Sequence, residues 1–270
     1  MLINATQDMF YSTTLSADTQ EYVEIPVPAG AAGIKILVGG GAGTLLTGFD
    51  TDATILASGW ESLFETFRLE DNTRSESKVI DLNYNSSATV NDMAHLTELA
   101  LLAAPIPGEQ MHTVSDRHIN LWTGPLGECR LFIKMRSSIA AAFASGSGTA
   151  ITLHFVALMA PAIAPQTWKQ YHIGQSTDTN VEFRYPSGVV SRSVITTGSD
   201  YDLDDIYIDG KHSTSNPITM AIDYNILRGH EAQGGNVYNR YFWGANLGGQ
   251  KVRFEKTATG AVHFSCIYQG

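Results

Sequence analysis

The sequence predicts an all-β protein built as two tandem sandwich-like halves. Three observations support this prediction. Apolar and polar residues alternate with a period of two in many short segments, clusters of turn-forming residues separate these segments, and a proline-containing stretch lies near the middle of the chain. Charged residues make up only 16% of the 270 residues, against about a quarter in an average protein. Ser, Thr, Asn, Gly and Gln must therefore supply much of the polar surface.

Strands are predicted wherever the alternation is clean. In the first half they lie at residues 21–27, 33–38, 78–84, 119–122, 129–135 and 150–158, and in the second at 180–185, 205–208, 218–222, 237–243, 251–255 and 261–268. Gly, Asn, Asp, Ser and Pro, which favour turns, fill the intervals.

A few short helices are predicted in the connections. Residues 60–69 place Leu63, Phe64 and Phe67 on one helical face, and residues 91–103 begin with Asn91 as a possible N-cap. A third helix is predicted at residues 137–144.

Residues 159–168, MAPAIAPQTW, carry two prolines that favour extended backbone. They predict a linker between a first half at 1–160 and a second half at 161–270. Each half is predicted to end with a β-hairpin, 129–135 with 150–158 and 251–255 with 261–268. This echo indicates a shared strand plan, with chance similarity of hairpins as the alternative.

The net charge of −10 and the absence of any Lys/Arg cluster argue against direct nucleic-acid binding and against an anionic membrane surface. No signal peptide is evident, and the longest apolar run, at 150–165, is too short to span a bilayer, so we expect a soluble protein. Cys129 and Cys266 lie in apolar strands and are expected to be buried free thiols, with a disulfide as the alternative.

No motif predicts catalysis. The glycines at 39–43 lack the Gly-Lys-Ser/Thr ending of a phosphate loop, and no nucleophile elbow occurs. The eight histidines form no metal-ligand pair, and His154 and His263 are expected to be ordinary strand residues. Glu61 and Glu65 fit an exposed helix face, so the chain is not expected to be an enzyme.

The acidic run 200–205, together with Asp209, is the sharpest local feature. Oxygen-rich loops can bind Ca²⁺, so Asp202, Asp204 and Asp209 are candidate ligands of a structural Ca²⁺ ion. The alternative is a solvated turn that leads into a strand, because the EF-hand spacing is absent. No other cofactor is predicted.

Aromatic residues gather at Tyr238, Tyr241, Phe242 and Trp243. Without interleaved basic residues beyond Arg240, they do not form a base-stacking platform. They are interpreted as core plus an interface patch, and a glycan-binding surface is the alternative.

The overall pattern resembles the double jelly-roll major capsid proteins of tailless icosahedral viruses, in particular those of membrane-containing bacteriophages. In the second half the resemblance rests on DIYIDG at 205–210, on Asn225 and Arg228 before VYNRYFW, and on the closing KVRFEKTATGAVHFSCIY. In the first half it rests on FRLEDNTR, VIDLNY and the CRLFIKM and AITLHFVALM strands. It spans most of the chain without a specific motif.

The resemblance implies two tandem jelly rolls, 1–160 and 161–270, and a virion shell protein that self-assembles into pseudo-hexagonal trimers. The implied partners are other copies of the chain, neighbouring capsomers, other virion proteins and an underlying viral membrane. The implied location is the capsid, after synthesis in the host cytoplasm. Two alternatives remain: a carbohydrate- or receptor-binding β-sandwich such as a spike or lectin-like module, and a glycosidase on a jelly-roll scaffold, which would need two facing carboxylates.

Overall fold

The structure, a computed structural model, describes residues 6–16, 22–40, 64–75, 77–83, 99–100, 102–103, 118–135, 150–159, 163–175, 177–228, 237–244 and 246–269. The chain divides into two compact units, Met1–Thr167 and Trp168–Gly270. The boundary predicted after residue 160 stays a prediction.

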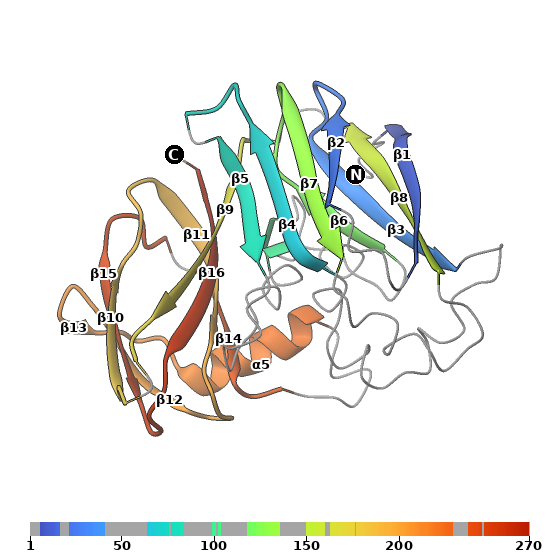
Figure 1. Ribbon diagram of the computed structural model, residues 1–270. Coiled ribbons are helices and arrows are strands. Elements are labelled where there is room, and N and C mark those ends of the chain that lie inside the picture. The colour runs from blue at the N-terminus through green and yellow to red at the C-terminus, as the bar shows by residue number, and fades with distance from the viewer. Residues whose placement is uncertain are drawn as a thin grey trace. The chain divides into compact units, whose positions relative to one another are not determined.

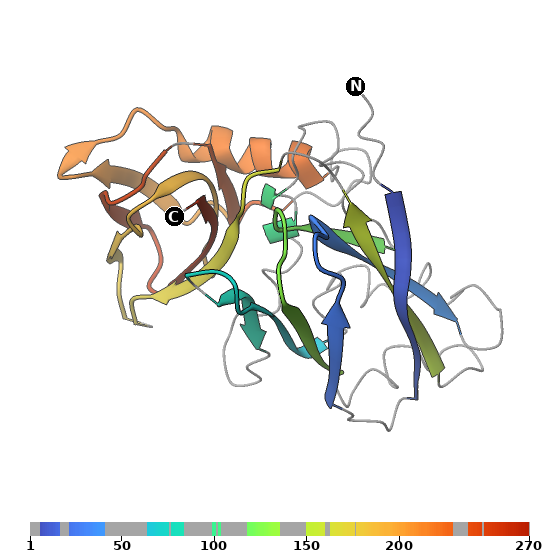
Figure 2. The same cartoon turned by 90° about the horizontal axis from the view of Figure 1, so that it is seen from above.

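The first unit contains two four-stranded antiparallel sheets that face each other (Figures 1 and 2). Its strands are β1 (Thr6–Ser16), β2 (Tyr22–Val27), β3 (Gly33–Gly40), β4 (Phe64–Asp71), β5 (Lys78–Asn83), β6 (His118–Trp122), β7 (Cys129–Met135) and β8 (Ala150–Met159). One sheet has the order β1-β8-β3-β6 and the other the order β2-β7-β4-β5.

The second unit repeats this plan and includes the helix α5. Its elements are β9 (Thr167–Ile173), β10 (Asn180–Arg184), β11 (Val189–Thr196), β12 (Leu203–Ile208), β13 (Lys211–His212), α5 (Pro217–Arg228), β14 (Arg240–Trp243), β15 (Lys251–Lys256) and β16 (Val262–Gln269). The sheet orders are β14-β11-β16-β9 and β10-β15-β12-β13.

The two units have identical connectivity. When the strands of each unit are counted from one to eight, both units have sheets 1-8-3-6 and 2-7-4-5. In both, the first strand pairs with the last, the second with the seventh, the third with the sixth and the fourth with the fifth, which is the jelly-roll arrangement. The predicted fold class, all-β with two tandem jelly rolls, is therefore confirmed.

The predicted closing hairpins are wrong, although the strands themselves are present. β7 pairs with β2 and β4, whereas β8 pairs with β1 and β3 in the other sheet. The same holds for β15 and β16. Consecutive strands seven and eight cross from one sheet to the other, so their adjacency in sequence does not make them partners. The echo between the halves reflects this shared topology.

Each core lies between the two sheets of its unit, where the inward residues of alternating strands meet. In β2, for example, Ile25 and Val27 are buried while Glu24 and Pro26 are exposed. In the second unit, Phe264 lies among Tyr171, Phe183 and Tyr185, with ring centroids 5.1, 4.3 and 5.1 Å from its own. Aromatic packing thus fills the middle of this sandwich.

Residues 64–69, predicted as the end of a helix at 60–69, belong to strand β4; residues 60–63 lie outside the described part of the chain. The register shifts between Phe64 and Thr66, which marks a β-bulge. The bulge brings Phe64 and Phe67 to the same buried side although they are three residues apart. A spacing that looks helical therefore arises within a strand.

Residues 218–222, predicted as a strand, belong to the helix α5. Asn216 caps the helix, because its side-chain oxygen accepts the backbone N–H groups of Ile218 and Thr219 at 2.9 and 3.2 Å. Pro217 occupies the first helical position, which proline favours. These start signals outweigh the β-branched residues that follow.

Residues 99–100 and 102–103 are helical and buried, in agreement with the end of the helix predicted at 91–103. The rest of that helix, and the helix predicted at 137–144, lie outside the described residues. Like α5, these residues follow the fifth strand of their unit and precede the sixth. Among the described residues, no helix is long and apolar enough to cross a membrane.

Candidate functional site

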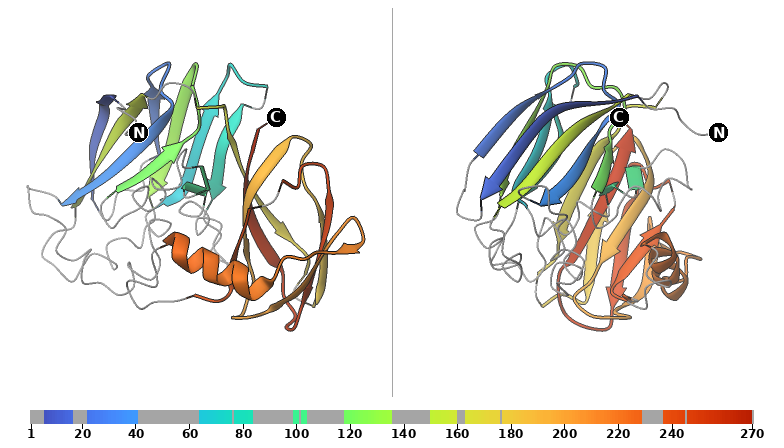
Figure 3. Two further views of the ribbon diagram at one scale, coloured as in Figure 1. Left: turned by 180° about the vertical axis from the view of Figure 1, so that it is seen from behind. Right: turned by 90° about the vertical axis from the view of Figure 1, so that its right-hand side faces the viewer.

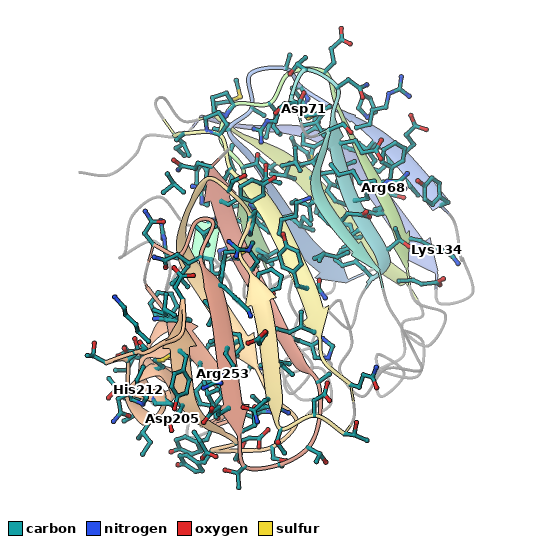
Figure 4. All side chains as sticks on the ribbon, turned by 90° about the vertical axis from the view of Figure 1, so that its left-hand side faces the viewer. Arg68, Asp71, Lys134, Asp205, His212 and Arg253 are labelled. Carbon is teal, nitrogen blue, oxygen red and sulfur yellow. The ribbon has the colours of Figure 1, made fainter. Side chains whose placement is uncertain are left out.

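The outer face of the sheet β2-β7-β4-β5 carries a polar network around Arg68. The guanidinium lies over the Phe132 ring at 4.6 Å, and the two residues are direct cross-strand partners on β4 and β7. Arg68 also donates to the Tyr22 hydroxyl at 3.1 Å and pairs with Glu70 at 3.0 Å. On the same sheet Lys134 pairs with Glu65 at 2.6 Å (Figure 4).

The matching sheet of the second unit, β10-β15-β12-β13, carries an equivalent network. The Arg253 guanidinium lies 4.1 Å from the Tyr207 ring, and these residues are again direct partners on the fourth and seventh strands. Arg253 pairs with Glu255 at 2.8 Å. His212 lies edge-on to Tyr207 and pairs with Asp205 at 2.8 Å (Figure 4).

In each unit, the arginine–aromatic pair joins the fourth and the seventh strand. The strand that carries the arginine differs between the two units. Arg68 lies on the fourth strand and Arg253 on the seventh. Their ion pairs are partly exposed, so each contributes little to stability and weakens with salt. Each of these faces is therefore an ordered polar surface.

A second cluster lies at one end of the first unit, where Asp71 and Arg74 join three loops. The fully buried Asp71 carboxylate accepts hydrogen bonds from Thr73 N–H (2.9 Å), Thr73 Oγ1 (2.6 Å) and Gly127 N–H (2.9 Å). It also pairs with Arg74 Nε at 3.3 Å. Burial alone would raise the pKa of Asp71, but the hydrogen bonds from Gly127 and Thr73 and the charge of Arg74 outweigh it and lower the pKa.

The remaining nitrogens of Arg74 donate to backbone carbonyl groups. Nη1 donates to Gln166 at 2.9 Å, and Nη2 lies 3.0, 3.3 and 2.8 Å from the carbonyl oxygens of Thr123, Gly124 and Pro125. Arg74 therefore ties the β4–β5 turn to the β6–β7 loop and to residues 163–166. We call Asp71 and Arg74 the loop node. No residue pattern in the sequence predicts it.

The glycines beside the loop node allow this close packing. Gly124 has a φ of +72°, and a Cβ atom there would lie 2.5 Å from the carbonyl oxygen of Ala164. Gln166 N–H also donates to the Thr123 carbonyl at 2.8 Å. Residues 164–166, in the second half of the predicted linker at 159–168, are thus held against the β6–β7 loop.

The three candidate Ca²⁺ ligands lie at both ends of β12. Asp202 and Asp204 lie at its beginning, whereas Asp209 follows its end. Each carboxylate accepts a hydrogen bond: Asp202 from Ala258 N–H (2.6 Å), Asp204 from Thr257 Oγ1 (2.8 Å) and Asp209 from Lys251 N–H (3.0 Å).

The charge of Asp202 is also opposed by a neighbouring cation. Burial of Lys256 lowers the pKa of its ammonium group. The negative charge of Asp202 acts in the opposite direction and raises that pKa again in part. A bound Ca²⁺ ion would compete with this ammonium group for the carboxylate. Within the described residues, no group of three or more His, Cys, Asp or Glu side chains is placed to hold a metal ion. The Ca²⁺ site stays a prediction.

The aromatic cluster contributes mainly to the core. Tyr241 and Trp243 are buried in the second unit, while Tyr238 and Phe242 are partly buried. The Tyr241 hydroxyl accepts the Leu203 N–H at 3.2 Å. The two side chains that best suited a glycan platform, Tyr241 and Trp243, are thus not on the surface.

The cysteines, histidines, glutamates and glycines considered in the sequence lie as follows. Cys129 and Cys266 are free and buried, and burial raises the pKa of each thiol to about 12, with the Asp71 carboxylate adding to the effect at Cys129. His154 lies 2.9 Å from the Ser12 hydroxyl, and His263 is buried in β16. Of the glutamates 61 and 65, only the second is described. Gly39 and Gly40 end β3, and residues 41–43 lie outside the described part.

Two solved structures are similar to this chain in fold. The major capsid protein P2 from bacteriophage PM2 matches with a TM-score of 0.55 and 12% sequence identity, over 96% of this chain and 97% of that chain. The STIV major capsid protein matches with a TM-score of 0.51 and 8% identity, over 96% of this chain and 95% of that chain. No protein-family model and no curated protein matches the sequence. The fold is that of the double jelly-roll viral major capsid proteins, as the sequence pattern predicts.

Proposed function

We propose that this chain is a viral major capsid protein that self-assembles into trimeric capsomers with a pseudo-hexagonal outline. The observation that carries the proposal is the repeated connectivity of the two units, combined with the full-length likeness to two major capsid proteins. The fold by itself does not determine function, so the proposal also needs a physical reason.

The repeat supplies that reason. Three chains related by a threefold axis would carry six units of the same connectivity. Such a trimer approximates a sixfold outline, which lets it tile a closed shell with few kinds of contact. The low content of charged residues is compatible with burying several faces of each subunit against neighbours.

The proposal places the protein in the virion shell, after synthesis in the host cytoplasm, with other copies of itself as its main partners. Neighbouring capsomers, other virion proteins and an underlying viral membrane are further proposed partners. It assigns no catalytic residue and requires no cofactor. No separate observation favours the glycan-binding alternative once Tyr241 and Trp243 lie in the core.

Sedimentation velocity and negative-stain electron microscopy of the purified chain test this proposal. A concentration series in low and moderate salt, with and without Ca²⁺, should show trimers that appear in micrographs as particles with six lobes. A protein that remains a monomer over the whole series would overturn the proposal. If trimers form only when Ca²⁺ is present, the predicted ion site gains support as well.

A further inference from the structure

The helix α5 exposes a stripe of three isoleucine side chains. Ile218, Ile222 and Ile226 are 58%, 42% and 52% exposed, and they account for three of the seven exposed large hydrophobic residues among those described. Because they are four residues apart, they lie on one side of the helix. We call these residues the isoleucine stripe.

The opposite side of α5 is firmly attached to the second unit. Met220, Ala221 and Tyr224 are buried, and the helix packs mainly alongside β14 (Figure 3). The Asn225 amide donates to the Ala221 and Val237 carbonyls at 2.9 and 2.7 Å and accepts the Val237 N–H at 2.8 Å.

The Tyr224 hydroxyl also accepts a hydrogen bond from Arg240 at 3.1 Å, and Asn216 caps the start of the helix. The stripe is therefore presented by an ordered helix. A preorganised apolar surface loses little conformational freedom when a partner covers it.

The charge of the molecule restricts what the partner can be if it is another copy. Each copy carries a net charge of −10, so two copies repel each other over most of their surfaces. The α5 sequence contains one acidic residue, Asp223, and one basic residue, Arg228, so the helix is formally neutral. A neutral apolar face is where two copies of an acidic protein can meet with the least repulsion.

The size of the stripe indicates the kind of contact. A 12-residue helix is about 18 Å long and about 10 Å wide. The exposed side of the helix therefore covers about 180 Å². This area is far below the roughly 800 Å² that each partner buries in a stable complex of two proteins. The stripe alone does not suffice for a free dimer, but it suits one of several contacts in a closed assembly.

We propose that the isoleucine stripe is a contact surface between copies of this chain in the assembled state. This inference rests on the proposed self-assembly and names one face that takes part in it. The occupant is a second copy, which buries the three isoleucines as neighbouring subunits close around each other.

The first experiment is a pair of charge substitutions at exposed apolar positions of the same unit. Ile222→Asp alters the centre of the stripe, and Val189→Asp is the matched control, since Val189 on β11 is 49% exposed. Sedimentation velocity should show that Ile222→Asp raises the protein concentration needed for half-assembly at least about tenfold. Val189→Asp should leave it within about twofold. Equal effects, or none, would overturn the inference. Circular dichroism checks that both variants fold. If the Ile222→Asp variant does not fold, Ile222→Ser takes its place.

The second experiment detects proximity without depending on shell formation. Because Cys129 and Cys266 are buried, a benzophenone maleimide should react with Ile222→Cys at the new thiol alone. A mixture of ¹⁵N-labelled and unlabelled protein is irradiated, and mass spectrometry identifies the crosslinked peptides. Crosslinks that join labelled to unlabelled chains support the inference. Crosslinks confined to single chains, or an adduct with solvent only, would refute it.

The two proposals fail in different ways. If the unmodified chain forms trimers but the Ile222 variants assemble equally well and give no crosslink between chains, the stripe is not an interface and the capsid proposal stands. If the chain stays monomeric at every condition, the capsid proposal fails. Crosslinks between chains would then still support the stripe as a contact, and their absence would overturn it too.

Discussion

Replacing Arg74 by methionine should destabilise the first unit more than the loss of an exposed charge such as Arg130, because the Arg74 side chain is only 13% exposed. The substitution keeps the length of the side chain and removes its donors. Nη1 and Nη2 together contact four backbone carbonyls, and Nε pairs with the buried Asp71 carboxylate. Nη2 has only two hydrogens for its three acceptors, so it makes at most two strong hydrogen bonds. With the one from Nη1, about three strong hydrogen bonds are lost.

The expected cost follows from the carboxylate left behind. Removing one partner of a buried ion pair typically costs about 3–5 kcal/mol. Asp71 keeps its hydrogen bonds from Thr73 and Gly127, so we expect the lower end, about 3 kcal/mol. For a domain of this size that corresponds to a fall of about 6–12 °C in Tm.

Differential scanning calorimetry and urea unfolding measure the effect. Arg130→Met is the matched control, because Arg130 forms an exposed pair with Glu24 on the same unit and should cost less than about 1 kcal/mol. If Arg74→Met and Arg130→Met have equal stability, the loop node does not fix these loops and the reasoning is wrong.

Three further predictions concern buried groups. The pKa of Asp71 is lowered below its ordinary value of 3.8 in the folded state, so its charge stabilises the fold above that pH and the benefit is lost as pH falls through the folded-state value. The stability gap between wild type and Asp71→Asn in urea unfolding should therefore shrink as the pH is lowered below 3.8. A gap independent of pH would contradict this. At about pH 8 an aromatic disulfide reagent should label Cys129 and Cys266 only after denaturation, because burial raises both pKa values to about 12; rapid labelling of the native protein would show that they are accessible. Phe264→Ala should cost about 3–5 kcal/mol, measured by chemical denaturation, because it empties a fully buried site; a loss below 1 kcal/mol would mean that the surrounding rings collapse into the space.

The sequence predicted strands well where the alternation is unbroken and poorly where a bulge interrupts it. β7 has the predicted bounds, Cys129–Met135. β1, β9, β11 and β13 were not predicted, and two of these four strands, β1 and β11, contain a register shift, at Met9/Tyr11 and Val190/Arg192. β12 begins at Leu203, two residues before the predicted start, because a shift lies between Leu203 and Asp205. An extra residue reverses the phase of the pattern, so a period-two rule fails there.

The loop node was beyond the reach of the sequence for another reason. Asn72, Thr73 and Arg74 were recognisable as a polar loop before a strand. The partners of Arg74 are carbonyl groups, which every residue carries, and they lie 49 to 92 positions away. Nothing in the residue types marks these acceptors. At the proposed metal ligand Asp202, the sequence likewise does not indicate that Lys256 and the Ala258 N–H lie beside the carboxylate.

The pairing of first and last strands has a consequence for biosynthesis. Thr6 lies opposite Met159, so the sheet β1-β8-β3-β6 cannot close until β8 has left the ribosome. At about 5–20 residues per second, the roughly 150 intervening residues take about 8–30 s to synthesise. During that time β1 and β3 lack the strand that will lie between them, and their unpaired edges are open to other nascent chains. This interval makes protection of these edges by chaperones during translation an expected requirement.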